Sequence, residues 1–253
     1  MIRGYDIGIM NTPEMKNGIL ALIGGGEFRK DCSIADEKLL RNIRKDSPLI
    51  AIIPTAAYDE DPELALYNGI NHFNDMGAAP FGVMALTRSD TSNQTNLEKI
   101  QTADLIYFTG GNPTYLLDTL QGSPLLQTII TSYERGVSIA GSSAGAMIFG
   151  QQFKYRNMWH KSLNWVTNSI VMPHHEEAPP TKIIQDTNMD LKSKTKLIGI
   201  DSSTALFIHS ASCSVAGNGR VSFYQNGTHR TFMQKDPVSF TVNVNPNAYL
   251  TDH

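Results

Sequence analysis

The stretch that decides the fold is residues 137–146, which read VSIAGSSAGA. Its first four residues form a short apolar run typical of a buried strand, and small residues follow where a helix would begin. Residues 141–145 have the form G-x-S-x-G, with Ser143 at the centre. At a strand-to-helix turn of this kind the serine stands above the sheet edge, and the glycines let neighbouring backbone approach closely. The pattern predicts Ser143 as a nucleophile, while a tight structural turn would leave the same signature.

Strands and helices alternate on both sides of this stretch. Apolar residues spaced three and four apart predict amphipathic helices at 36–44, 62–76, 96–102 and 113–135. Strands alternating with helices form a parallel sheet covered by helices on both faces. We therefore expect an α/β fold with a doubly wound, mostly parallel sheet. Its buried strands are predicted at 19–23, 49–53, 80–86, 105–109 and 137–140.

From about residue 197 the pattern changes to short strands with turn signals. The expected strands are 205–209, 212–216, 221–225 and 228–233. Gly217-Asn218-Gly219 and Asn226-Gly227 predict the turns of antiparallel hairpins. The sequence has no internal repeat and no low-complexity linker, so we expect one domain over residues 17–253. Residues 1–16 precede the first strand pattern and are predicted to be an N-terminal extension.

Composition excludes several classes of partner. The 253 residues carry a net charge of −3 and a pI of about 6.1, which leaves no basic surface for nucleic acid. Uninterrupted apolar stretches reach five residues, whereas a helix that spans a membrane needs about 20. Asp6, Asn11, Pro13 and Glu14 interrupt the apolar core that an export signal would need. We therefore expect a cytoplasmic protein with no membrane partner.

No metal ion or organic cofactor is expected. Cys32 and Cys213 match neither a disulfide framework nor the paired spacing of a zinc site. Residues 174–177, HHEE, place possible ligands next to one another, where their side chains diverge. Residues 24–27, GGGE, lack the dinucleotide fingerprint because Arg29 stands where the third glycine should be.

A second glycine pair, Gly110-Gly111, ends the strand expected at 105–109. The carboxyl ends of parallel strands share one edge of a sheet, where ligands bind. The backbone N–H groups of Gly111 and Ala144 could together form an oxyanion hole at that edge. A plain turn before the helix that starts at Pro113 explains the pair equally well.

A nucleophilic serine needs a base, and the sequence contains seven histidines. Residues 170–175 predict a strand that delivers a histidine to its own end. Successive residues of a strand face opposite sides, so only one of His174 and His175 can serve the site. His72 falls in a predicted helix, while His209 and His229 fall in or beside hairpins.

The motifs resemble those of the cyanophycinase and dipeptidase E family of serine peptidases. That resemblance implies a flavodoxin-like sheet similar to the sheet of class I glutamine amidotransferases, with serine in place of cysteine at the turn. It implies cleavage of small peptides or isopeptides that contain aspartate, and often a homodimer. The matching segments, in the family's order, are 110–112 (GGN), 141–146 (GSSAGA), 173–174 (PH) and 199–205 (GIDSSTA).

The resemblance also assigns roles residue by residue. Ser143 becomes the nucleophile and His174 the general base, while Gly111 and Ala144 become the oxyanion donors. Asn112, beside the glycine pair, becomes a candidate substrate contact.

The third member of the triad departs from the family pattern. The family usually has G-I-D-E-x-T-A, in which the glutamate orients the histidine, and here Ser202 stands in its place. Losing an orienting carboxylate can lower the rate by about 10⁴-fold. Asp201 is an alternative, although along an extended segment it should point the other way. Glu176 or Glu177 could reach in from the adjacent loop.

Cyanophycin itself is not the expected substrate. Cyanophycinases have a glutamine before the histidine and several arginines after it. Here Pro173 precedes His174, and no arginine occurs between Arg156 and Arg220.

Three functions remain. The first is a hydrolase that cleaves a small peptide through an acyl-enzyme on Ser143. The second is a catalytically impaired relative that binds a small ligand or a partner. The third is an α/β-hydrolase with the chain order serine, acid, histidine, using Asp186 or Asp201 and then His209 or His229.

Overall fold

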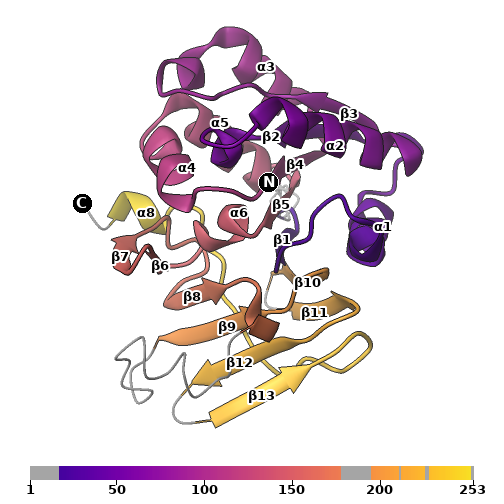
Figure 1. The fold of residues 1–253 in the computed structure, drawn as a ribbon, viewed down its shortest axis with the longest axis vertical. Coiled ribbons are helices and arrows are strands. Elements are labelled where there is room, and N and C mark those ends of the chain that lie inside the picture. The colour runs from indigo at the N-terminus through magenta and orange to yellow at the C-terminus, as the bar shows by residue number, and fades with distance from the viewer. Residues whose placement is uncertain (1–16, 178–194, 211, 226–227, 252–253) are drawn as a thin grey trace, which may run out of the picture.

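The computed structural model describes residues 17–177, 195–210, 212–225 and 228–251. Its main sheet has seven strands in the order β11-β10-β1-β5-β4-β2-β3 (Figure 1). Two strands, β10 (Thr204–His209) and β11 (Ser212–Gly217), extend the β1 edge in antiparallel pairing. The other five are parallel, which confirms the predicted sheet: β1 (Leu20–Ile23), β2 (Leu49–Ile53), β3 (Ala79–Gly82), β4 (Leu105–Phe108) and β5 (Ser138–Ser142).

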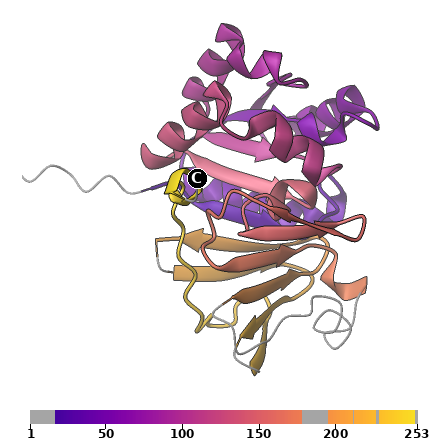
Figure 2. The same ribbon diagram turned by 90° about the vertical axis from the view of Figure 1, so that its left-hand side faces the viewer.

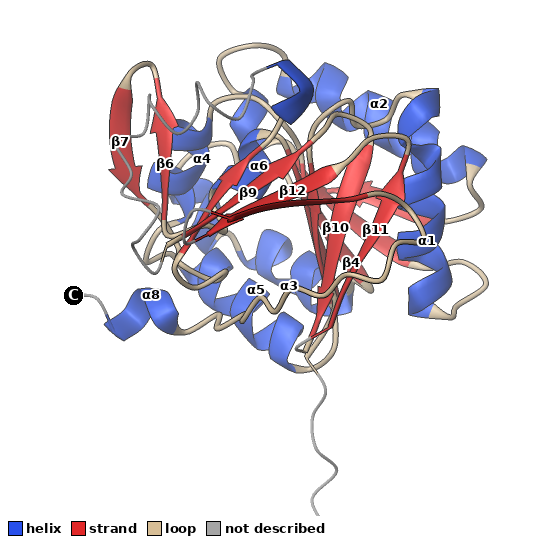
Figure 3. Cartoon of the chain, turned by 90° about the horizontal axis from the view of Figure 1, so that it is seen from below, coloured by secondary structure: helices blue, strands red, loops and turns tan. Residues whose placement is uncertain are grey.

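Helices cover both faces of the main sheet (Figure 3). Along β1, Leu20 and Leu22 pack into the core on one face, and Ala21 and Ile23 pack into the core on the other. Helices α1 (Ser33–Ile43) and α2 (Pro62–Asp75) cover the face of Ala21. The face of Leu20 is covered by α3 (Gln94–Thr102), α4 (Pro113–Leu120), α5 (Pro124–Glu134) and α6 (Ala144–Met147).

A second sheet of four strands lies beside the main one (Figure 2). Its inner side chains, including Ile198 and Phe223, join the same apolar cluster as Leu206 and Ile208 of β10. The two sheets therefore share one core. The strands, in the order β13-β12-β9-β8, are β8 (Ser169–Met172), β9 (Lys196–Ile200), β12 (Val221–Gln225) and β13 (Thr228–Phe232).

The C-terminal hairpins are distributed differently from the prediction. Strands β10 and β11 pair antiparallel, as do β12 and β13, but the two pairs belong to different sheets. Gly217-Asn218-Gly219 therefore links the sheets and does not close a hairpin. Gly217 has φ +125°, and a Cβ atom there would lie 2.3 Å from the carbonyl oxygen of Ser203. The close passage of two backbones explains the glycine.

Two further expectations were wrong in detail. The helix predicted over 113–135 is two helices, because Pro124 cannot continue α4 and instead begins α5. Ser123 caps α5 by accepting a 3.1 Å hydrogen bond from the N–H of Leu126. The strand predicted over 80–86 ends at Gly82. The predicted extension 1–16 lies outside the described residues.

Short elements complete the fold. None of the helices in the described ranges combines the length and the apolar character that crossing a membrane requires. The short elements are the hairpin of β6 (Gln152–Tyr155) and β7 (Met158–Lys161), the 3-10 turns η1 (Lys30–Cys32), η2 (Thr55–Ala57), η3 (Ser89–Ser92) and η4 (His175–Glu177), and α8 (Ala248–Thr251).

Candidate active site

Loops from the carboxyl ends of the parallel strands meet at one edge of the main sheet. Residues 24–27 follow β1, Gly110 and Gly111 follow β4, and Ser143 follows β5. A cleft of about 1190 Å³ opens there, and Ser143 and His174 both line it. The cleft thus lies where ligands bind in open α/β sheets.

Ser143 occupies a strained turn between β5 and α6. Its φ is +49° and its ψ is −114°, a backbone region that non-glycine residues rarely adopt. A Cβ atom at Gly141 would lie 2.2 Å from the carbonyl oxygen of Gly145. One at Gly145 would lie 2.8 Å from the carbonyl oxygen of Phe108. Both glycines of the motif are therefore required by backbone packing, and the turn lifts the serine into the cleft.

His174 lies opposite Ser143, with its Nε2 atom 3.1 Å from the serine Oγ. His174 follows β8 of the second sheet. Its backbone N–H donates a 2.8 Å hydrogen bond to the carbonyl oxygen of Gly24. Gly25 lies against the imidazole, since a Cβ atom there would be 2.2 Å from Cε1 of His174. The structure thus brings together the two residues that the motifs predicted as a pair.

His175 points away from the cleft, as strand alternation predicted. Its Nε2 atom lies 2.8 Å from the hydroxyl oxygen of Tyr224, and its side chain is buried. Burial lowers the pKa of His175, because a charged imidazolium is poorly solvated there.

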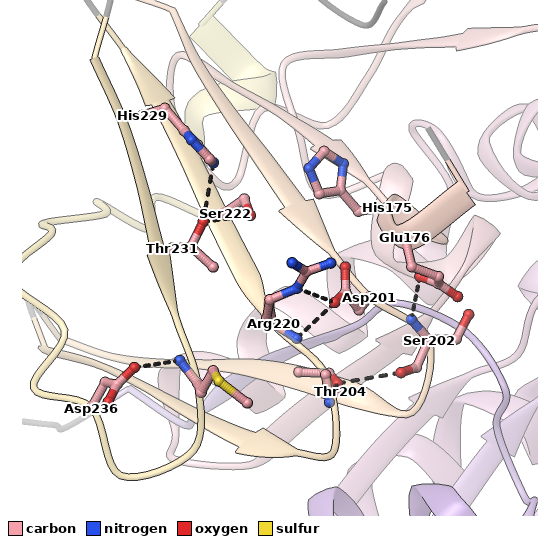
Figure 4. Close-up of polar contacts among 12 residues, drawn as sticks. His175, Glu176, Asp201, Ser202, Thr204, Arg220, Ser222, His229, Thr231 and Asp236 are labelled. Carbon is pink, nitrogen blue, oxygen red and sulfur yellow. Dashed lines mark hydrogen bonds and ion pairs between the residues drawn. The ribbon is translucent and has the colours of Figure 1, made fainter. Parts of the chain in front are cut away.

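Ser202 occupies the third position of the predicted triad. Its Oγ lies 3.0 Å from Nδ1 of His174, a distance at which the ring N–H donates to the hydroxyl. The N–H of Ser202 in turn donates a 2.8 Å hydrogen bond to Oε2 of Glu176 (Figure 4).

Asp201, considered as an orienting acid, does not contact His174. Its Oδ2 accepts hydrogen bonds from Arg220, 2.9 Å from the backbone nitrogen and 3.1 Å from Nε (Figure 4). Neighbouring side chains of an extended segment diverge, so Asp201 turns away from the side on which Ser202 meets the histidine. Asp201 instead pairs with Arg220 just before β12, and in this ion pair the carboxylate is buried while the guanidinium is exposed.

The predicted oxyanion donors have free N–H groups. Within the described part of the chain, the backbone N–H groups of Gly111 and Ala144 donate to no other group. Gly111 has φ +132°, and a Cβ atom there would lie 2.1 Å from the carbonyl oxygen of Ala56. Ala144 is the first residue of α6, so its N–H belongs to the positive end of that short helix.

Asn112 is a helix cap, and its side chain is occupied by neighbours. Its Oδ1 accepts hydrogen bonds of 3.1 Å from the N–H groups of Thr114 and Tyr115. Its Nδ2 donates a 3.0 Å hydrogen bond to Oδ2 of Asp59. These contacts give Asn112 a structural role at the start of α4, and the substrate contact at Asn112 stays a prediction.

Glu27 is a site residue that sequence reasoning missed. Its Oε1 accepts a 2.7 Å hydrogen bond from the N–H of Gly110, and its Oε2 accepts one of 2.7 Å from the hydroxyl of Ser142. One carboxylate thus joins the loops that follow β1 and β4 to the last residue of β5. The signal was a polar residue directly after the glycines at a strand end, where only a glycine-rich turn was inferred.

The two histidines considered as the base of an α/β-hydrolase, His209 and His229, do not line the cleft. His209 ends β10 beside the amino-terminal end of β1, since Ile208 pairs with Leu20. His229 lies on β13 and contacts Thr231 Oγ1 through Nε2, at 3.0 Å. Neither side chain reaches Ser143, and Asp186 lies outside the described residues.

One group of possible metal ligands occurs in the described residues. The donor atoms of His174, Glu176 and Glu177 lie within 4.8 Å of one another. Both ring nitrogens of His174 are already hydrogen-bonded to serine hydroxyls. These contacts engage the histidine with Ser143 and Ser202, so we assign no metal to the group.

The doubly wound sheet, the strained serine turn and the open cleft are together typical of a hydrolytic enzyme. The family comparison makes this specific. The model of Peptidase family S51 matches residues 20–216, and the chain belongs to that family.

The chain is also similar to several relatives and solved structures. An uncharacterized peptidase of Pasteurella multocida is 27% identical over 70% of this chain and 88% of that protein. A cyanophycinase of Synechococcus elongatus is 30% identical over 53% of this chain, but that region is only 42% of the cyanophycinase. The crystal structure of a peptidase from an acI-B1 actinobacterium covers 90% of this chain, with a TM-score of 0.77 and 28% identity. A putative peptidase E protein of Listeria monocytogenes, 19% identical over 80% of this chain and all of its own, shares the fold with a TM-score of 0.59.

Proposed function

We propose that this protein is a serine-type hydrolase that cleaves an amide bond of a small peptide through an acyl-enzyme on Ser143. One observation carries the proposal: the Ser143 Oγ lies 3.1 Å from Nε2 of His174 at the lining of the large cleft. That distance is within hydrogen-bond reach, as proton transfer between a nucleophile and its base requires.

The reaction follows from these contacts. The Ser143 Oγ forms a bond to the carbonyl carbon of the substrate while its proton passes to Nε2 of His174. The N–H groups of Gly111 and Ala144 stabilise the negative charge that develops on the carbonyl oxygen. Collapse of this intermediate breaks the C–N bond, and the imidazolium gives its proton to the leaving amine.

Water completes the cycle. It attacks the acyl carbon while His174 accepts one of its protons. Cleavage of the bond between the acyl carbon and Oγ then releases the carboxylic acid, and the proton returns to Ser143.

The substrate class we propose is a short peptide or isopeptide, with aspartate as a candidate residue. Arg29 and Lys30 line the cleft and supply positive charge for a substrate carboxylate. The same cleft carries Glu37 and Glu60, which suit the amino group of a short peptide.

A binding protein without catalysis is the second candidate. The observation in its favour is that Nδ1 of His174 meets the Ser202 hydroxyl, where the family pattern has a carboxylate. A hydroxyl accepts the ring N–H but carries no charge to stabilise an imidazolium.

A fluorophosphonate probe distinguishes these two candidates. We expect covalent labelling of the wild-type protein and none of Ser143→Ala, because the Ser143 Oγ faces Nε2 of His174 and Ser143 lines the cleft that the probe enters. Intact-mass spectrometry measures the adduct, and circular dichroism checks that the variant is folded. An unlabelled wild type at every pH between about 6 and 9 would favour the binding protein.

Ser202→Glu tests the identity of the third partner. We expect the second-order rate constant for fluorophosphonate labelling to stay unchanged or to rise, because a carboxylate beside Nδ1 stabilises the imidazolium directly. Ser202→Gln is the matched control, since it has the same size without the charge. A large loss in Ser202→Glu would mean that the site depends on the hydroxyl itself.

A further inference from the structure

We infer that Glu176 is a positioning residue of this site, which supplies through Ser202 the negative charge that a directly bonded acid would give His174. The inference rests on the proposed function. It assigns an unbroken chain of contacts that runs from the nucleophile through His174 and Ser202 to a carboxylate.

The contacts of Ser202 carry the argument. Its Oγ is 3.0 Å from Nδ1 of His174, and its backbone N–H donates a 2.8 Å hydrogen bond to Oε2 of Glu176. Burial alone would raise the pKa of Glu176, but hydrogen bonds from the side chain and the backbone of Ser202 outweigh it and lower that pKa. Glu176 is therefore held as a carboxylate beside Ser202, whose backbone N–H it accepts.

The donors and acceptors are consistent along the series of contacts from Ser143 to Glu176. The Ser202 Oγ accepts the Nδ1–H of His174, which leaves the Ser202 hydroxyl proton free to point toward the Glu176 carboxylate that the Ser202 backbone N–H binds. Nε2 is then the unprotonated nitrogen that faces the hydroxyl of Ser143. A hydroxyl polarised by a carboxylate accepts more strongly than an isolated one, so the charge of Glu176 is felt at the imidazole.

Other charged groups around the histidine are engaged differently. Glu27 is bonded to Gly110 and Ser142, and Asp201 is paired with Arg220. Glu177 is exposed, and its backbone N–H closes the turn by donating to the carbonyl oxygen of His174. His175, buried and with a lowered pKa, faces Tyr224.

Glu176→Gln tests the inference, with Glu177→Gln as the matched control. Both variants remove an exposed carboxylate that lies within 4.8 Å of the histidine ligand atom, but only Glu176 contacts Ser202. We expect Glu176→Gln to slow fluorophosphonate labelling by about 10- to 100-fold, less than the loss of a directly bonded acid. Glu177→Gln should label at the wild-type rate. Equal rates for the two variants would overturn the inference.

The Ser202→Glu variant provides a second test, which distinguishes a positioning role of Glu176 from a purely structural one. In Ser202→Glu the added carboxylate meets His174 directly, so introducing Glu176→Gln there should cost less than twofold in labelling rate. A loss as large as in the parent protein would mean that Glu176 only supports the fold, and the inference would fail. If wild type itself does not label, the proposed function fails first. If wild type labels and Ser143→Ala does not, the outcome for Glu176 concerns this inference alone.

Discussion

His174→Ala should lower the rate of fluorophosphonate labelling, and of any peptide hydrolysis, by about 10⁴- to 10⁶-fold. The reason is geometric: Nε2 of His174 lies 3.1 Å from the Ser143 Oγ, and among the described residues no other side chain is hydrogen-bonded to that oxygen. The ring is only half-buried, so its removal should change the thermal unfolding midpoint little. The measurement is the second-order rate constant for labelling, followed by intact-mass spectrometry.

The control for this prediction is His209→Ala. His209 is one of the two candidate bases in the α/β-hydrolase order, the other being His229, but it lies at the far end of β10 from the cleft. We expect the His209→Ala variant to be labelled at the wild-type rate. Unchanged labelling in His174→Ala would disprove the assignment of the base, and a loss confined to His209→Ala would favour the other chain order.

Gly25→Ala should reduce labelling by about 100- to 1000-fold, because a displacement of about 1 Å in a catalytic group can cost 10²-fold. A Cβ atom at position 25 would lie 2.2 Å from Cε1 and 2.6 Å from Nε2 of His174. The imidazole must therefore leave the position in which Nε2 lies 3.1 Å from the Ser143 Oγ. Gly25 also has φ +119°, so the substitution strains the folded backbone and should lower the free energy of unfolding by roughly 1–3 kcal/mol.

Gly77→Ala is a control that introduces backbone strain without displacing the imidazole of His174. Gly77 has φ +81°, and no atom lies within 4 Å of a Cβ atom built there. We expect this variant to lose about 1 kcal/mol of stability and to keep its labelling rate. Urea unfolding measures the first quantity and probe kinetics the second. If both variants label equally well, the imidazole has room that the structure does not show.

The elements of the main sheet were predictable because each is encoded locally. The run 49–53 became β2 residue for residue, and Pro62 marked the start of α2. The second sheet was not foreseen. Its strands β8 and β9 pair in parallel across a long stretch of intervening chain, and no local pattern specifies such a pairing.

The site was predictable to the extent that motifs encode it. G-x-S-x-G and the Pro173-His174 pair identified the two residues that the fold brings together. The third partner was left open because it depends on which way neighbouring side chains turn and on how the turn η4 folds back. Asp201 turned toward Arg220, and Glu176 turned toward Ser202. These directions arise from tertiary packing, which outweighs local sequence.

Ser143 and His174 belong to different sheets, and this division has a consequence during biosynthesis. The strand that bears the serine emerges from the ribosome well before the segments that complete the second layer. A nascent chain with only its parallel strands ordered would hold the serine without its proton acceptor. Under the proposed mechanism, Ser143 would therefore gain its base only when the second sheet docks.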